Sequence, residues 1–113
     1  MVARGDLWWV DFGHPRGSEP GYRRPALVIS SNRFNRSGIR TVIVATVTSN
    51  MRLAEAPGNV TLEGPGNPLP KPSVVNVSQV LTANRAVLDA PVGAIAPRAL
   101  RAVDDGLRLV LHV

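Results

Sequence analysis

The sequence predicts a mainly β domain: a small, strongly twisted barrel or half-barrel followed by one C-terminal helix. Two observations predict this fold class. Short stretches rich in β-branched and aromatic residues recur, with turn residues between them, as far as Ile95. After them, one stretch places apolar residues at helical spacing. With 113 residues and no internal repeat or linker, we expect a single domain over residues 1–113 with one modest core.

The first expected strand covers residues 7–12, between Asp6 and a Gly-His-Pro sequence. Alternation places Trp8, Val10 and Phe12 on one wholly apolar face, which we expect to point inward. Trp9 falls on the opposite face.

Residues 13–24 have no periodicity and form a long loop rich in glycine and proline. Pro25 biases Arg24 toward an extended conformation, so we expect Arg24 at the mouth of a second strand, residues 26–30. A guanidinium fixed there is a candidate phosphate-binding group. The alternative is a solvated surface arginine in an ordinary hairpin loop.

Residues 41–47 are nearly all β-branched, which predicts a central strand buried on both faces. If this strand pairs antiparallel with residues 26–30, Arg24 and Thr48 lie at the same rim of the sheet. Thr48 and Ser49 would then add hydroxyls beside the guanidinium. On spacing alone, the favoured alternative is that the Thr48 hydroxyl caps its own backbone.

The other segments are shorter. Residues 31–40 are expected to be a turn-rich connection, and residues 51–57 either a helical turn or a loop. Strands are expected at residues 59–62, 73–77 and 92–95, and a short helical turn or a bend at residues 78–81. Pro97 opens the helix, in which Leu100, Val103, Leu107 and Leu111 repeat and which Gly106 weakens.

The composition favours a nucleic-acid partner and a cytoplasmic location. The net charge is +5, and all 13 basic residues except Lys71 are arginine. A genome rich in G and C would also favour arginine. The chain has no cysteine, which excludes disulfides and thiolate zinc sites, and no apolar stretch long enough for a membrane span or a secretory signal.

Common catalytic signatures are missing. The sequence contains no Walker-type phosphate loop, no dinucleotide fingerprint and no serine in a nucleophile elbow. His14 and His112 lie far apart, so we expect no metal site. His14 is a candidate general acid–base group, with exposed loop filler as the alternative.

Five motifs in this order strongly resemble the MazF/PemK family of toxin endoribonucleases from type II toxin–antitoxin pairs. They are RGDLW (4–8), GSE (17–19), RPALVI (24–29), TSN (48–50) and SVVNVSQ (73–79). The resemblance implies an SH3-like barrel with a long C-terminal helix, working as a homodimer. It also implies metal-independent, cofactor-free, sequence-selective cleavage of single-stranded RNA by the substrate's own 2′-hydroxyl, leaving a 2′,3′-cyclic phosphate and a 5′-hydroxyl.

The resemblance also implies roles for individual residues. Arg24 matches the catalytic arginine, Thr48 the catalytic threonine and Glu19 the acid of the loop. Since arginine stays protonated near neutrality, Glu19 is the preferred general base, followed by His14. Further substrate-binding residues are expected to be Ser18, Arg23, His14, Ser49, Asn76 and Gln79. Arg23 stands where some members carry a histidine, which removes a proton carrier and adds a charge. From the residues themselves, Trp8 and Trp9 are candidates for stacking on RNA bases, but alternation places them on opposite faces, so we expect one of the two in the core.

The same resemblance implies an antitoxin whose acidic, poorly ordered tail covers the RNA groove. Two alternatives belong to other functional classes. A toxin of the same architecture that poisons DNA gyrase would be expected to end in an aromatic contact, whereas this chain ends Leu-His-Val. A non-catalytic nucleic-acid-binding module would bind RNA without cutting it.

Overall fold

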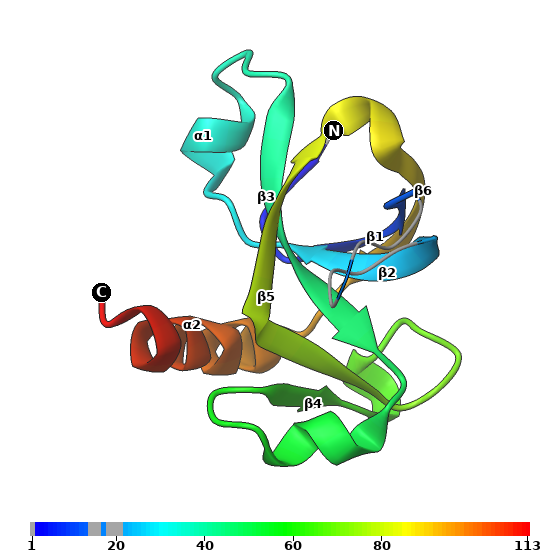
Figure 1. The fold of residues 1–113 in the computed structure, drawn as a ribbon, viewed down its shortest axis with the longest axis vertical. Coiled ribbons are helices and arrows are strands. Elements are labelled where there is room, and N and C mark those ends of the chain that lie inside the picture. The colour runs from blue at the N-terminus through cyan, green and yellow to red at the C-terminus, as the bar shows by residue number, and fades with distance from the viewer. Residues whose placement is uncertain (1, 14–16, 18–21) are drawn as a thin grey trace.

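The structure is a computed structural model that describes residues 2–13, 17 and 22–113. Six strands form one antiparallel sheet in the order β4-β5-β3-β2-β1-β6 (Figure 1). The strands are β1 (Asp6–Asp11), β2 (Arg23–Val28), β3 (Thr41–Thr48), β4 (Val60–Leu62), β5 (Ser73–Asn84) and β6 (Leu88–Ala94). The helices are α1 (Asn32–Asn35) and α2 (Pro97–Leu111), with 3₁₀ turns η1 (Met51–Glu55), η2 (Gly64–Gly66) and η3 (Arg85–Val87). The curled sheet with a C-terminal helix confirms the predicted fold class.

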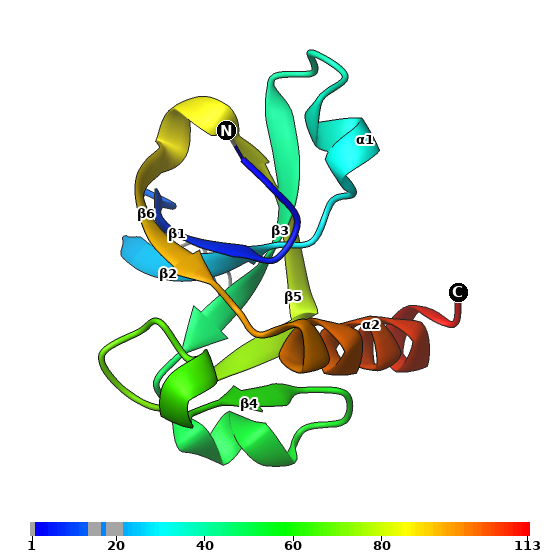
Figure 2. The same cartoon turned by 180° about the vertical axis from the view of Figure 1, so that it is seen from behind.

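Apolar side chains pack on both faces of the sheet. One cluster includes Leu7, Leu27, Val47 and Val103, and lies where α2 crosses β5 beside β4 (Figure 2). The cluster on the other face is made of Val10, Ala26, Val28, Val42, Val44 and Ala83, with Trp8 and Phe12 packed against it. The inward face expected for the first strand is thus confirmed. Because β3 contributes to both clusters, it is also buried on both faces, as predicted.

Of the two alternatives expected for residues 78–81, the helical turn is absent, because β5 continues through these residues, and the bend is present within the strand. The register against β3 shifts between Ala45, which faces Val80, and Thr46, which faces Asn76. The extra residues form a bulge at which β5 bends (Figure 1). The Thr46 hydroxyl donates to Gln79 Oε1 at 3.0 Å, so a polar sequence typical of a turn is satisfied within the sheet.

Other boundaries also differ from expectation. β2 covers Arg23–Val28, whereas residues 26–30 were expected. It begins earlier because residues 23–25 pair with β1, before the pairing with β3 starts at Ala26. The expected turn-rich connection contains the short helix α1, where the Ser31 hydroxyl accepts from Phe34 N–H at 3.1 Å. Of the two alternatives left open for residues 51–57, the helical turn is present: residues 51–55 form η1, and the Asn50 side chain before it accepts from Arg52 N–H at 3.2 Å.

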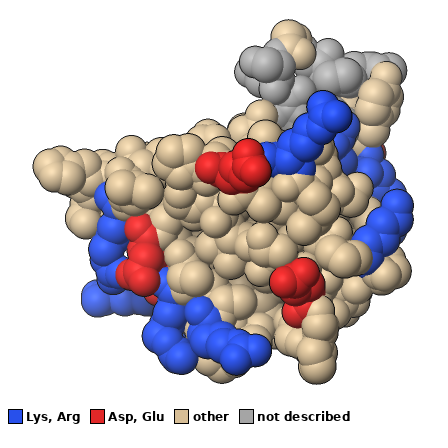
Figure 3. All heavy atoms as spheres, turned by 90° about the horizontal axis from the view of Figure 1, so that it is seen from below, with Lys and Arg blue, Asp and Glu red and all other residues tan. Residues whose placement is uncertain are grey.

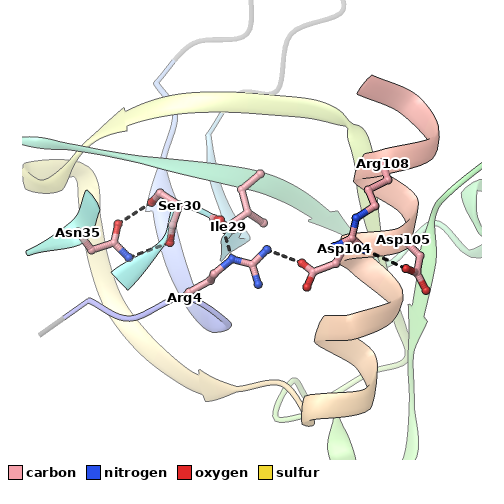
Figure 4. A network of polar contacts seen from close by, with 7 residues as sticks. All are labelled: Arg4, Ile29, Ser30, Asn35, Asp104, Asp105 and Arg108. Atoms are coloured by element: carbon pink, nitrogen blue, oxygen red, sulfur yellow. Dashed lines mark hydrogen bonds and ion pairs between the residues drawn. The ribbon is translucent and has the colours of Figure 1, made fainter. Parts of the chain in front are cut away.

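Arg4 ties the N-terminus to two other parts of the chain (Figure 4). Its Nε donates to Ile29 O at 2.9 Å, and its guanidinium forms an ion pair with Asp104 of α2. Close by, the Asn35 amide donates to Ser30 O at 3.0 Å, which anchors α1 to the end of β2. Arg4, in the first of the five motifs, is therefore held in a structural network.

α2 begins at Pro97 as predicted, and its Gly106 has a packing reason. A Cβ atom on Gly106 would lie 2.0 Å from Gly58 O, so only glycine lets the helix approach this backbone. The contact holds the turn that leads into β4 against α2. None of the helices in the described part of the chain has the length and hydropathy of a membrane-spanning segment.

Candidate active site

A hollow of about 320 Å³ opens where β2 and β3 separate. Its lining comes from the starts of β2 and β5, the end of β3, one residue of β1 and the segment before β5. These residues are Trp9, Tyr22, Arg23, Arg24, Pro25, Val47, Thr48, Ser49, Leu69, Pro70, Lys71 and Ser73.

Strand pairing brings Arg24 and Thr48 to the same rim of this hollow. β2 and β3 are antiparallel, as expected, and their paired residues run from Val28–Val44 to Ala26–Thr46. Arg24 lies two residues before Ala26, and Thr48 two residues after Thr46. The ladder stops beside Pro25, which has no N–H to donate. The hollow therefore lies beyond the last paired residues, with both side chains at its wall.

The Thr48 hydroxyl is oriented by the backbone that follows it. Asn50 N–H donates to Thr48 Oγ1 at 3.1 Å, so the backbone cap considered as an alternative is present. A hydroxyl that accepts from an amide still has its own proton to donate. The cap and a contact with a ligand oxygen are therefore compatible, and the cap limits the directions that the hydroxyl can take.

Arg23 is held by two neighbours. Its Nε donates to Asp89 Oδ2 at 2.6 Å, and its guanidinium carbon lies 4.7 Å from the centre of the Trp9 ring. Sequence reasoning considered Trp9 only as one of two stacking candidates and did not place Asp89. The contacts of Asp89 depend on the pairing of β6 with β1, for which the local sequence carries no signal.

Three cationic side chains line the hollow, namely Arg23, Arg24 and Lys71, and none of its described lining residues is a carboxylate. Figure 3 shows the wider charge pattern, with basic side chains covering more of the drawn face than acidic ones. The Lys71 segment is held by the Asn67 side-chain amide, which donates to Lys71 O at 2.9 Å and to Leu62 O at 3.1 Å. A single lysine between two prolines was the sequence signal that could have drawn attention to this segment.

The other candidate residues are distributed differently. Ser49 lines the hollow, whereas Asn76 and Gln79 do not. Asn76 is buried and accepts from the Ser78 hydroxyl at 2.9 Å, and Gln79 bonds Thr46, so both lie within the β5 bulge. His14, Ser18 and Glu19 lie outside the described residues.

The part of the chain that the structure describes contains no group of three His, Cys, Asp or Glu side chains placed to hold a metal ion. What the hollow does offer is positive charge with a hydroxyl at its rim. Guanidinium groups and hydroxyls in this arrangement suit a phosphate group, because both can donate to its oxygens.

The chain resembles known proteins over its whole length. It is 45% identical over 113 residues to Endoribonuclease MazF2 of Mycobacterium bovis and to Endoribonuclease MazF6 of Mycobacterium tuberculosis, covering 100% of this chain and 99% of each relative. Among solved structures, MazF of Deinococcus radiodurans matches with a TM-score of 0.82 at 26% identity, covering 99% of this chain and 97% of that one.

A second solved structure is an endoribonuclease in complex with its cognate antitoxin from Mycobacterial species. It shares the fold, with a TM-score of 0.84 at 24% identity, over 100% of this chain and 97% of that one. Residues 3–111 match the family described as PemK-like, MazF-like toxin of type II toxin-antitoxin system. The resemblance inferred from the five motifs is confirmed: the chain belongs to the PemK-like, MazF-like family of toxins from type II toxin–antitoxin systems.

Proposed function

We propose that this protein is an endoribonuclease toxin that cuts single-stranded RNA at the hollow and is neutralised by a cognate antitoxin. One observation carries the proposal. In a chain 45% identical to proteins named endoribonucleases, Arg24 and Thr48 share the rim of a hollow lined by three cationic side chains. A phosphodiester placed there would meet positive charge and a hydroxyl donor together.

The nucleophile in the proposed reaction comes from the RNA. The ribose 2′-hydroxyl attacks the adjacent phosphorus, and the bond from phosphorus to the 5′-oxygen of the next nucleotide breaks. The 2′-hydroxyl proton goes to a general base, and the departing 5′-oxygen takes up a proton. The products are a 2′,3′-cyclic phosphate and a 5′-hydroxyl, and the scheme includes no metal ion or other cofactor.

Arg24 and Thr48 have complementary roles in this scheme. The Arg24 guanidinium stabilises the charge that develops on the phosphate oxygens as the 2′-oxygen adds, and we propose it as the donor of the proton that the departing 5′-oxygen takes up. The Thr48 hydroxyl, oriented by Asn50 N–H, donates to a phosphate oxygen and holds the group in line for attack. Preorganised donors of this kind stabilise a transition state because they need little reorganisation when charge develops.

The general base must be another group, since an arginine side chain is protonated near neutral pH. We propose Glu19 for this role, with His14 as the second candidate. For substrate contacts we propose Ser18, Arg23 and Ser49. Asn76 and Gln79, also expected to contact RNA, bond to other residues of the protein, and we assign them to shaping β5.

For neutralisation, we propose that an acidic and poorly ordered antitoxin segment lies over the hollow. Carboxylates on that segment would mimic RNA phosphates beside Arg23, Arg24 and Lys71, so that RNA and antitoxin compete. We also propose that the toxin acts as a homodimer. Support for antitoxin binding comes from the same fold solved in complex with a cognate antitoxin.

The test is cleavage of mixed RNA by the purified protein in the presence of EDTA, followed by mapping of the cuts and analysis of their ends. Cuts at a defined sequence, with cyclic phosphate and 5′-hydroxyl ends, support the proposal. Repeating the assay with one 2′-deoxyribose at the mapped site should abolish that cut alone. RNA binding without cleavage would instead indicate a non-catalytic module.

A further inference from the structure

The ion pair between Arg23 and Asp89 spans three strands. Arg23 is on β2 and Asp89 on β6, and β1 lies between these strands in the sheet. Neighbouring strands are about 4.8 Å apart, so the two side chains can meet only by reaching over β1. What lies on β1 beneath them is Trp9, whose ring centre is 4.7 Å from the Arg23 guanidinium carbon.

The backbone accounts for each member of this group. Arg23 pairs with Asp11 of β1, and Trp9, two residues earlier, is the diagonal neighbour on the same face. On the other side, Trp9 pairs with Ala90 and Val10 with Leu88, so Asp89 is the extra residue at a shift of register. An irregularity of this kind re-aims a side chain, and here the carboxylate points across β1 to the guanidinium.

Arg23 is held but not covered. The Trp9 ring lies against the guanidinium and Asp89 accepts from Nε, yet the Arg23 side chain is still 50% exposed. Arg23 also lines two adjacent hollows: the one with Arg24 and Thr48, and a second that includes Asp11, Val87 and Asp89. The group therefore offers a partly accessible guanidinium, backed by an aromatic ring, at the boundary between the two hollows.

We infer that Asp89 is a positioning residue that holds Arg23 over Trp9, and that the resulting shelf stacks one unpaired RNA base beside the scissile phosphate. This inference rests on the proposed function. Single-stranded RNA presents unstacked bases, which stack on aromatic rings and guanidinium planes. Arg24 and Thr48 hold the phosphate in the first hollow, and the shelf receives the base of an adjacent nucleotide. The shelf contributes to RNA affinity and to the choice of cut site, whereas Arg24 and Thr48 contribute to the rate of cleavage.

The experiment measures the Kd of an RNA oligonucleotide that contains the mapped cut site, blocked by a 2′-O-methyl ribose. A series of oligonucleotides carries one abasic position each. For the wild type, loss of the stacked base should weaken binding about 5- to 50-fold at one position next to the cut. For Asp89→Ala, which removes the acceptor for Arg23 Nε, and for Trp9→Leu, the same abasic change should weaken binding less than about 2-fold, because the shelf is already lost.

Two further variants separate positioning from a general defect. Asp89→Glu retains the carboxylate and should restore most of the dependence on that base. Asp105→Asn, which removes the exposed ion pair with Arg108 on α2, is the matched control and should behave as the wild type. In single-turnover cleavage of unblocked RNA, Asp89→Ala should keep a saturating rate within about 3-fold of the wild type. Only the RNA concentration at half-saturation should rise.

The outcomes distinguish this inference from the proposed function. If the wild type cuts RNA but Asp89→Ala keeps the full abasic penalty at every position, the shelf is refuted and the proposed function stands. A uniform loss of binding at all positions, or a loss confined to the saturating rate, also refutes the shelf. A wild type that neither binds nor cuts RNA refutes both.

Discussion

Arg24 and Thr48 lie at the same rim of the sheet, each two residues beyond Ala26–Thr46, the pair that ends the ladder between β2 and β3. Both line one hollow, together with Arg23 and Lys71. The pairing of two strands thus places a guanidinium and a hydroxyl together although they are 24 positions apart in the sequence.

Replacing Thr48 with valine should slow cleavage by about 10²-fold or more, because it removes a preorganised donor while keeping the shape of the side chain. The variant also loses the bond from Asn50 N–H, which should reduce the free energy of unfolding by about 1 kcal/mol. Thr48→Ser should retain most of the activity. Single-turnover rates and urea unfolding measure the two effects, and Thr61→Val, at an exposed position of β4, is the control. A Thr48→Val enzyme with the wild-type rate would remove the hydroxyl from the mechanism.

Replacing Lys71 with glutamine should weaken RNA binding without changing the sequence that is cut. Each phosphate contact on single-stranded RNA contributes about 0.7 to the slope of log K against log salt concentration. The magnitude of the slope should therefore fall by about 0.7 in Lys71→Gln, and Arg101→Gln on α2 should leave it unchanged. An unaltered slope in Lys71→Gln would show that this lysine contacts no phosphate.

An acidic antitoxin peptide should compete with RNA for binding to the toxin. The affinity of each ligand should fall as the salt concentration rises, because salt screens the attraction between the cationic hollow and an anionic ligand.

Replacing Gly106 with alanine should destabilise the protein by about 1–3 kcal/mol or more, because the added Cβ meets Gly58 O at 2.0 Å. Helix propensity alone predicts the opposite sign, a gain of about 1 kcal/mol. The midpoint of urea unfolding decides between the two. A more stable Gly106→Ala protein would show that α2 does not approach the Gly58 turn as described.

The ion pair between Arg4 and Asp104 should stabilise the fold more than the pair between Arg108 and Asp105. The side chains of the first pair are 24% and 29% exposed, and those of the second 62% and 80%. Arg4 also donates to Ile29 O, so Arg4→Ala should cost about 1–3 kcal/mol. A double-mutant cycle should give a coupling energy above about 1 kcal/mol for the first pair and below about 0.5 kcal/mol for the second. Equal coupling energies would contradict this comparison.

The sequence was informative wherever local pattern decides the structure. The β-branched residues of β3 predicted a central strand, and helical spacing after Pro97 predicted α2. The meeting of Arg24 and Thr48 followed from one assumption, the antiparallel pairing of two neighbouring strands. It could be anticipated because consecutive strands usually pair.

Features that depend on irregular strand pairing, or on the path of a segment outside the strands, could not be predicted. The β5 bulge contains Ser78 and Gln79, whose polarity suggests a turn until Thr46 is known to bond Gln79. Asp89 reaches Arg23 only because β6 changes register against β1. Lys71 comes to the hollow because the segment before β5, held by Asn67 and the buried Leu69, folds back over the end of β3. Such contacts arise from the path of the chain and leave no local signal.

The most direct test of the central claim is the single-turnover rate of RNA cleavage by Arg24→Ala, measured beside Arg101→Ala, which removes an exposed arginine on α2. Urea unfolding of both variants separates a lost catalytic group from a folding defect, and Arg24, at the start of β2, is exposed as Arg101 is. We predict a loss of at least about 10² in rate for Arg24→Ala and none for Arg101→Ala. A folded Arg24→Ala protein that cuts RNA at nearly the wild-type rate would contradict the account.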